Sequence, residues 1–313
     1  MLSYIGKRLL QLVVVMLGVT FLTFFVTTLT PSDAAEMYYY SNGIVPSEEQ
    51  LAATRHEFGL DRPFPVRYVD WLGGVLRGDF GESLMDSESI MQKFVRKLPK
   101  TLELTGATLL LVVLVSLPLG ALTAVYSNRL PDNVVRLITF LGVAMPGFWM
   151  ALLIMYFLGV QLKILPIIGT GDMKSMIMPG LSLGIPMICS YTRQVRTAVL
   201  EEISGEYVTG LRSRGVGERE IIAHHVLPNA MIPIVNMLGL SLGGLLGGST
   251  IVESIYNWKG IGSMVVTAIT NRDYPTIQCY VLWMSVIYVV SNLIVDISHY
   301  LMDPQLRIKE LSR

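Results

Sequence analysis

The sequence contains little charge and little cysteine. Only 15% of its 313 residues are Asp, Glu, Lys or Arg, the formal net charge is zero, and there are two cysteines. Two cysteines do not make a disulfide framework, and Cys189 and Cys279 lie in apolar runs, where cysteine is a small packing residue. With 52% hydrophobic residues and a mean hydropathy of +0.53, the chain has the composition of a membrane protein.

A phosphate-binding loop is also absent, because no GxxxxGK[ST] pattern occurs. Such a loop cradles nucleotide phosphates, so the chain lacks the usual means of binding ATP. We therefore expect no enzyme activity and no cofactor in this chain. Acidic side chains at the middle of a membrane span would indicate a proton-coupled carrier or a channel. Glu103, Glu253 and Asp296 all fall at the ends of apolar runs, which weakens that alternative.

Six charge-free runs are each near the roughly 20 residues that cross a bilayer. They are residues 9–32, 104–128, 137–162, 175–192, 226–252 and 274–295. The fourth run is the shortest and contains Pro179 and Pro186, so it either kinks or continues past Arg193 as a helix that leaves the bilayer. The fold class that we expect is an all-α membrane protein with six transmembrane helices.

Basic residues beside these runs predict the orientation. Lys7 and Arg8 precede the first run, Arg129 and Arg136 follow the second, and five arginines lie between the fourth and fifth. Short cytoplasmic loops are enriched in Lys and Arg, so both termini are predicted to be cytoplasmic. The first run exceeds the length of a signal-peptide core, and we expect it to remain as an anchor.

The loop before residue 100 is then extracytoplasmic and contains two helical patterns. Ser47 opens the first, with Gln50 three residues later, and Pro63 breaks it. Tyr68 and Trp71 lie on one face of the second. This loop either contacts a soluble partner or covers the mouth of the helix bundle.

The longest charged insert in the second half covers residues 193–228. An apolar residue recurs there at every fourth position, which predicts one amphipathic helix. These residues are Val199, Ile203, Tyr207 and Leu211. Gly215 suits the left-handed end of that helix, and Glu218 and Glu220 suit the first turn of the next one. The pattern predicts two short helices at the cytoplasmic face, which dock on a partner or, as the alternative, lie on lipid headgroups.

Other motifs are weaker. Gly-Leu-Ser-Leu-Gly occurs at residues 180–184 and 239–243 and matches the pattern of serine hydrolases. A nucleophilic serine needs a base within reach, and the one candidate in a span, His299, lies at another depth. We interpret the glycines of 239–248 instead as small residues that let helices approach closely.

A metal path is a further possibility. Methionine sulfur suits soft metals, but methionine more often fills gaps in a core. The candidates for a translocation path or gate are Met145, Met150, Met187, Glu253 and Trp258. His224 and His225 are adjacent and point about 100° apart on a helix, so they do not chelate as a pair. We expect no dedicated metal site.

Several stretches resemble one family of transport proteins. Residues 209–215, and His225-Val226-Leu227-Pro228 nine residues later, resemble the EAA loop of ABC importer permeases. The chain departs from that pattern at Thr209, Gly210 and Leu211, where Glu-Ala-Ala would stand, and at His225. The stretches at 99–107, 140–149, 252–262, 271–278 and 303–307 also resemble the peptide/nickel branch, so the similarity runs nearly end to end.

This resemblance implies a type I ABC importer permease core. It implies residues 1–100 as an N-terminal helix with an outer loop, 101–302 as the permease core and 303–313 as a cytoplasmic tail. The partners would be a second homologous permease, two cytoplasmic ATPases that bind ATP and Mg, and an extracytoplasmic solute-binding protein, with no nucleic acid. The ATPase-coupling residues would be Tyr207, Thr209, Gly210, Leu211, Arg212, Ser213, Arg214, Gly215, Val216, Gly217, Leu227 and Pro228. The stretches look closest to nickel-import permeases of the bacterial inner membrane, with dipeptide or oligopeptide import as the alternative.

Overall fold

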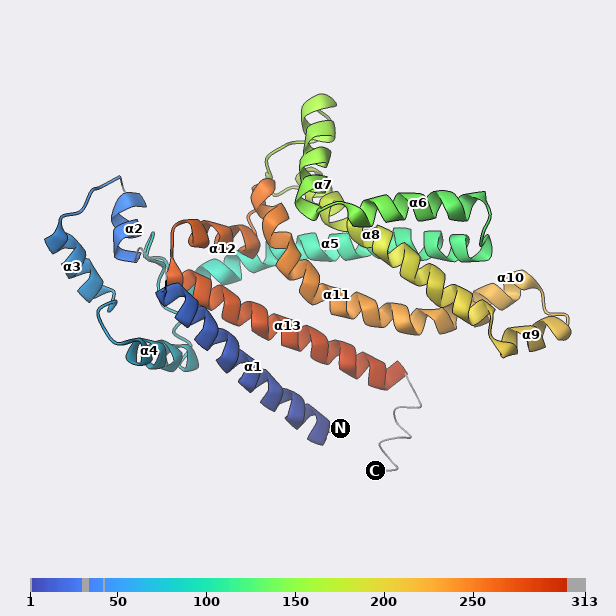
Figure 1. The fold of residues 1–313 in the computed structure, drawn as a ribbon, viewed down its shortest axis with the longest axis horizontal. Helices are drawn as coiled ribbons and strands as arrows, with labels where there is room; N and C mark the ends of the chain where they lie inside the picture. Colours follow the sequence, from blue (N-terminus) through green and yellow to red (C-terminus); the bar gives the residue numbers. More distant parts are fainter. Residues whose placement is uncertain (1, 30–33, 42, 303–313) are drawn as a thin grey trace. The chain divides into compact units, whose positions relative to one another are not determined.

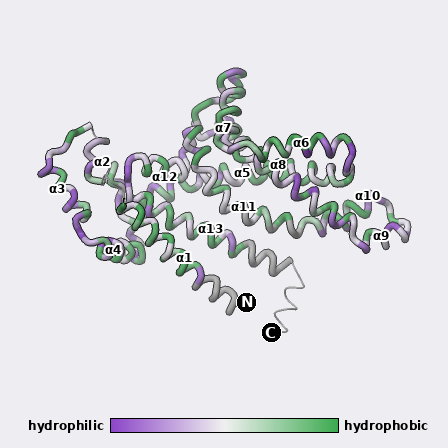
Figure 2. The backbone as a smooth tube through the Cα atoms, in the orientation of Figure 1, coloured by the Kyte–Doolittle hydropathy of each residue, from purple (hydrophilic) through white to green (hydrophobic). Residues whose placement is uncertain are grey.

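The computed structural model describes residues 2–29, 34–41 and 43–302, and every element named in these ranges is a helix (Figure 1). The predicted tail at 303–313 lies outside the described residues. The chain divides into two compact units. The first comprises residues 1–101 and 259–290, and the second comprises 102–258 with 291–313. Figure 2 shows hydrophilic residues on α3 of the first unit and around α9 and α10 of the second.

The described residues of the first unit form five complete helices and parts of two others. They are α1 (Leu2–Thr28), α2 (Ala34–Ser41), α3 (Glu48–Glu57), α4 (Phe64–Leu76), the start of α5 (Ile90–Val125), α12 (Ile261–Thr270) and most of α13 (Tyr274–Met302). Ser47 caps α3 with a capping box to Gln50, which confirms the predicted start of that helix. Helix α4 packs on α1 through edge-on aromatic contacts of Phe21 and Phe24 with Phe64 and Tyr68. These aromatic contacts hold α4 of the outer loop against α1.

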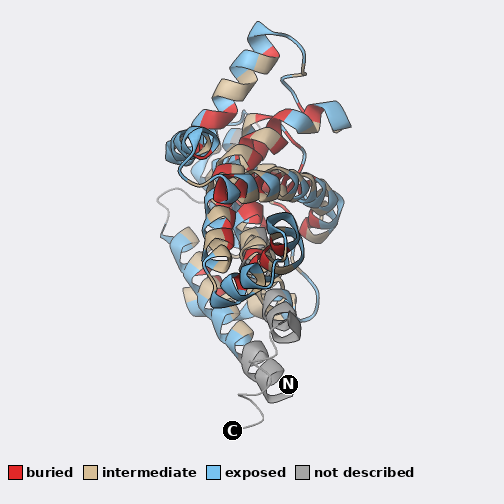
Figure 3. Cartoon of the chain, turned by 90° about the vertical axis from the view of Figure 1, so that its right-hand side faces the viewer, coloured by how far each residue is buried: buried red, intermediate tan, exposed pale blue. Residues whose placement is uncertain are grey.

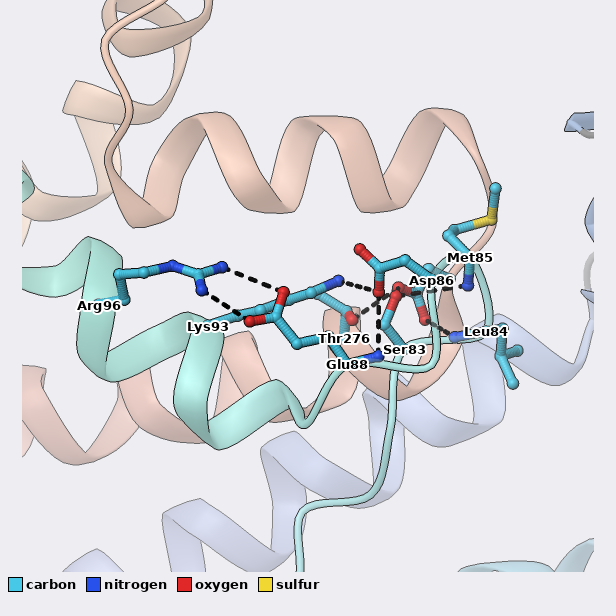
Figure 4. A network of polar contacts seen from close by, with 9 residues as sticks. Ser83, Leu84, Met85, Asp86, Glu88, Lys93, Arg96 and Thr276 are labelled. Atoms are coloured by element: carbon cyan, nitrogen blue, oxygen red, sulfur yellow. Dashed lines mark hydrogen bonds and ion pairs between the residues drawn. The ribbon is translucent and has the colours of Figure 1, made fainter.

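A buried carboxylate connects the rest of the outer loop to α13. Asp273 is 3% exposed and accepts hydrogen bonds from Ser83 Oγ at 2.6 Å, Thr276 Oγ1 at 2.7 Å and the backbone N–H of Leu84 at 3.2 Å. Beside it, Glu88 pairs with Arg96 and Asp86 with Lys93 (Figure 4). A buried charge is stable only when it is hydrogen-bonded, so Asp273 fixes the segment before α5 on the start of α13.

The second unit is built around α8 (Met173–Ile203). Its other elements are the rest of α5, α6 (Leu130–Ala144), α7 (Gly147–Ile154), η1 (Met155–Gln161), α9 (Glu206–Ser213), α10 (Glu218–Glu220), η2 (Ile221–Val226) and α11 (Leu227–Ile255). Helices α6, α7 and α11 all pack on α8. Helix α8 continues past Arg193 and contains both Pro179 and Pro186, as one of the two sequence alternatives predicted.

Two glycines allow α5 and α6 to lie close against α8. A Cβ on Gly120 would come within 2.5 Å of Val195 Cβ, and one on Gly142 within 2.3 Å of Cys189 Sγ. Neither distance is possible for real atoms, so a Cβ at either position would force a neighbouring group to move. Cys189 is buried and free, as expected for a packing residue.

Gly120→Ala is therefore expected to lower the free energy of unfolding by about 1–3 kcal/mol, because the new methyl group overpacks the α5–α8 contact. Gly106→Ala is the matched control on α5, where a Cβ meets nothing within 4 Å. That substitution is expected to raise stability by up to about 1 kcal/mol through helix propensity. Unfolding of the detergent-solubilised protein measures both, and equal effects of the two substitutions would contradict the close contact.

The predicted third span is not one continuous helix. Helices α6 and α7–η1 meet at an angle of 105°. Met145 is extended, with ψ of 130°, because the ring of Pro146 disfavours the helical conformation of the residue before it. Pro146 then serves as the N-cap residue of α7. The prediction of a single helix over residues 137–162 is wrong for this physical reason.

Three described helices are long and apolar enough to cross a membrane, and the bent pair adds a fourth if it is one span. Helices α8 and α11, with 31 and 29 residues, occupy the fourth and fifth predicted runs. The number six therefore stays a prediction. Figure 3 shows long exposed stretches on the helices, and many of these exposed residues are large and apolar.

Candidate functional site

The charged insert does not form one amphipathic helix. Helix α8 ends at Ile203, and α9 begins at Glu206 after a break at Ser204 and Gly205. The break changes the register, so Val208 is fully buried, whereas Tyr207 is 40% exposed and donates a hydrogen bond to Glu202 Oε2 at 2.7 Å. The four-residue spacing did not predict that Val208 is buried, because that spacing applies only to an uninterrupted helix.

The end of α9 is a left-handed glycine turn, as predicted. Gly215 has φ of +80°. Its N–H bonds to the carbonyl of Arg212 at 3.0 Å, and the N–H of Val216 bonds to the carbonyl of Leu211 at 3.2 Å. These two bonds form a Schellman motif, and the accompanying apolar contact between the residues at its two ends is expected. Leu211 and Val216 indeed both pack on the same buried cluster.

An ion pair closes the turn on its outer side. Arg212 Nε lies 2.6 Å from Glu218 Oε1 and Nη2 lies 3.2 Å from Oε2, so the guanidinium binds both carboxylate oxygens. The hydrogen bond from Arg212 lowers the pKa of Glu218. Because both side chains are well exposed, the pair contributes little stability and mainly fixes the direction in which α10 leaves the turn.

Helix α9 and the segment η2 pack on a buried apolar cluster. Its members come from α5, α8, α9, η2 and α11, and include Val199, Val208 and Ile221. Leu211, Val216 and Leu227, which we expected to contribute to docking, pack partly buried against this cluster of the chain itself. The exposed predicted coupling residues are Tyr207, Thr209, Gly210, Arg212, Ser213, Arg214, Gly215, Gly217 and Pro228. The exposed face of the predicted coupling segment therefore lies on a buried apolar cluster of the chain itself.

A second candidate site is a cavity of about 460 Å³ between α7, α8 and α11. Its walls include Phe148, Leu183, Pro186 and Met187, and no charged residue is among the described residues that line it. A neutral cavity of this kind can pass a solute without holding it tightly.

The serines of the two Gly-Leu-Ser-Leu-Gly motifs are structural. Ser182 is 1% exposed and hydrogen-bonds to Tyr256 Oη at 2.9 Å and to the carbonyl of Met178 at 2.7 Å. Ser241 hydrogen-bonds to Tyr191 Oη. Among the described residues, the partners of these two hydroxyls are a tyrosine hydroxyl in each case and a backbone carbonyl for Ser182.

The predicted path and gate residues differ in their exposure, and their role in transport stays a prediction. Met187 lines the cavity, Met145 is partly buried, and Met150, Glu253 and Trp258 are buried. The backbone N–H of Trp258 bonds to the carbonyl of Glu253 at 2.8 Å, which closes the end of α11. Within the described residues, no three His, Cys, Asp or Glu side chains gather into a potential metal site.

Three of the α11 glycines differ from the expectation of close packing. A Cβ on Gly244, Gly247 or Gly248 would meet nothing within 4 Å, and Gly244 and Gly248 line the cavity. The close helix contacts of this unit lie instead at Gly120 and Gly142. These three glycines leave open space beside α11 among the described residues.

One ion pair close to α9 and α10 was not predicted from the sequence. Asp132 at the start of α6 is fully buried and accepts bonds from Arg196 Nε at 2.7 Å and Nη2 at 2.8 Å, and from the N–H of Asn128 at 2.8 Å. Pro131 followed by Asp132 signals a helix start, but the partner lies 64 residues away. This ion pair fixes α6 on α8.

Comparisons with known proteins agree with this architecture. Residues 116–308 match the family model of the binding-protein-dependent transport system inner membrane component, and residues 1–105 match the model of its N-terminal part. The chain is 35% identical to the glutathione transport system permease protein GsiC of Salmonella typhimurium and 32% identical to that of Escherichia coli K12. Both alignments cover 99% of this chain and 100% of the relative.

Solved structures show the same fold. An inward-facing MetNI methionine ABC transporter chain matches 69% of this chain and 99% of its own length, with a TM-score of 0.59 and 19% identity. An amino acid ABC transporter chain matches 68% of this chain and 95% of its own, with a TM-score of 0.57 and 18% identity.

The family implies ATPase and substrate-binding partners in general. Both relatives are named for glutathione transport. On the match over both parts of its length, this chain belongs to the binding-protein-dependent transport system inner membrane components, and it is a multi-pass ABC importer permease of the peptide/nickel type in the inner membrane.

Proposed function

We propose that this chain is one permease subunit of an ATP-driven importer of small peptide-like solutes. The observation that carries the proposal is the identity of 35% over 99% of the chain to a permease named for glutathione transport. The neutral cavity between α7, α8 and α11 supports it, because Met187 is the one soft metal ligand among the lining residues. A peptide-sized solute suits about 460 Å³ better than a bare ion does. Nickel, as a chelate, is the weaker alternative.

In this proposal, a second homologous permease completes the translocation path, and an extracytoplasmic protein delivers the solute. Two cytoplasmic ATPases bind ATP and Mg and supply the energy. They contact the exposed face of α9, with Arg214 and Thr209, while the Schellman turn and the cluster beneath it transmit the motion to α8 and α11 as a rigid body. The chain's own contribution to solute selection is small because the described residues that line its cavity are all uncharged.

Uptake by cells that lack this gene tests the cargo. We expect radiolabelled glutathione or dipeptide uptake to fall to background and to return when the gene is restored, with nickel uptake unchanged. Loss of nickel uptake alone would overturn the peptide-like assignment while leaving the family intact. Purified chain in liposomes without ATPases is expected to transport none of the three solutes, and transport by the chain alone would instead indicate a channel or secondary carrier.

A further inference from the structure

A second, cationic cavity lies between α6 and α8 of the second unit. Its volume is about 610 Å³. Helix α6 contributes Asn133, Arg136, Leu137 and Phe140, which are spaced i, i+3, i+4 and i+7 and so share one face. Helix α8 contributes Arg193, Arg196 and Thr197, spaced i, i+3 and i+4. The cavity is therefore formed by two facing helix surfaces.

The charge in this cavity is not balanced within the described chain. Arg196 is already bound to Asp132, with both carboxylate oxygens engaged, and its side chain is 18% exposed. Arg136 and Arg193 are exposed, and no ion pair of either is found among the described residues. Of the three guanidinium groups that line the cavity, two thus have no ion pair among the described residues, with ten N–H donors between them.

The cavity has a polar part, lined by the arginines, and an apolar part, lined by Leu137 and Phe140. Leu137 and Phe140 follow Arg136 toward the bend at Pro146, and they are 61% and 64% exposed. The basic loops predict that the start of α6 is cytoplasmic, so the arginines lie near the inner headgroups and the apolar pair lies deeper. A free phosphate ion would use the arginines alone. A phospholipid would use the arginines for its headgroup and Leu137 and Phe140 for the first part of its acyl chains.

We propose that this cavity binds the phosphate headgroup of an anionic phospholipid of the cytoplasmic leaflet, through Arg136 and Arg193. Guanidinium groups bind phosphate oxygens in pairs, and basic pockets between membrane helices on the cytoplasmic side suit such headgroups. Thr197 and Asn133 supply further polar groups at the same level. The bound lipid lies beside the Asp132–Arg196 pair and so beside the base of the coupling helices.

Native mass spectrometry of the purified full chain, with phosphatidylglycerol or phosphatidylcholine added in detergent, tests the proposal. The variant Arg136→Gln/Arg193→Gln is expected to bind phosphatidylglycerol about tenfold more weakly, which corresponds to about 1.4 kcal/mol, with phosphatidylcholine binding unchanged. Arg214→Gln/Arg219→Gln removes the same charge from exposed positions outside the cavity and is expected to bind like the wild type. Arg136→Lys/Arg193→Lys keeps the charge and is expected to lose less affinity than the glutamine pair, which separates a headgroup site from a folding defect.

Three results would overturn the proposal. Unchanged phosphatidylglycerol binding in the glutamine pair would place the lipid elsewhere. Full displacement of phosphatidylglycerol by inorganic phosphate at constant ionic strength would indicate a site for a free anion. If the complex purified with its partner subunits bound no phosphatidylglycerol while the chain alone did, the cavity would be an interface for an acidic segment of a partner.

Discussion

Arg196→Met is expected to lower the free energy of unfolding by about 3–5 kcal/mol, because it leaves the Asp132 carboxylate buried without its cation. Asp132 is fully buried, and Arg196 supplies two of the three hydrogen bonds described for it. Methionine preserves most of the volume of the arginine stem, so the loss reports on charge and hydrogen bonding. Chemical unfolding of the detergent-solubilised protein measures the effect.

The double variant Asp132→Asn/Arg196→Met is the control for this prediction. Removing both charges together is expected to recover most of the lost stability, because no uncompensated charge remains and the introduced amide oxygen can still accept the N–H of Asn128. Arg196→Lys is expected to lie between the wild type and the methionine variant, since an ammonium group cannot bind both oxygens in the same plane. Additive losses in the double variant would show that the two residues act independently.

Gly215→Val is expected to reduce ATP-driven uptake about tenfold or more while the helix bundle stays folded. A β-branched residue at φ of +80° costs about 1–3 kcal/mol, and this strain is confined to the turn between α9 and α10. A Cβ at this position meets nothing within 4 Å, so steric overlap with neighbours does not contribute. Uptake into liposomes that contain the assembled transporter, with its ATPase activity recorded in parallel, measures the coupling.

Gly217→Val is the matched control, two residues further along the same turn. Gly217 has φ of −67° and equally open surroundings, so valine fits there without strain. Gly215→Asn is expected to retain more uptake than Gly215→Val, because asparagine tolerates the left-handed region. Equal uptake by the two valine variants would remove the Schellman turn from the coupling mechanism.

Local signals in the sequence predicted local structure well. The pair Ser47 and Gln50 predicted the start of α3, and Gly215 predicted the left-handed end of α9, because each effect involves residues within one helical turn. The bend at Pro146 was harder, since a proline in an apolar run can kink a helix, sit inside it as Pro186 does in α8, or begin a new one. Only the packing of the neighbouring helices decides between these cases.

Contacts between distant segments were not predictable in the same way. Nothing in the sequence pairs Asp132 with Arg196, and the glycine-rich run of α11 looked like a closer-packed helix than the single Gly120 of α5. For the site, the position and turn of the coupling segment followed from the sequence. Its exposed face did not, because the break at Gly205 changed which side chains point inward.

The bend between α6 and α7 also determines what surrounds it. A helix end leaves its terminal backbone groups without intrahelical partners, and here two ends meet, with the N–H groups of Gly147 and Phe148 at the start of α7. Hydrocarbon offers no hydrogen bonds, and each unsatisfied group there costs several kcal/mol. Residues 146–149 are exposed in the isolated chain. In the membrane, this corner therefore faces water or another protein surface, and lipid tails contact the straight parts of the two helices.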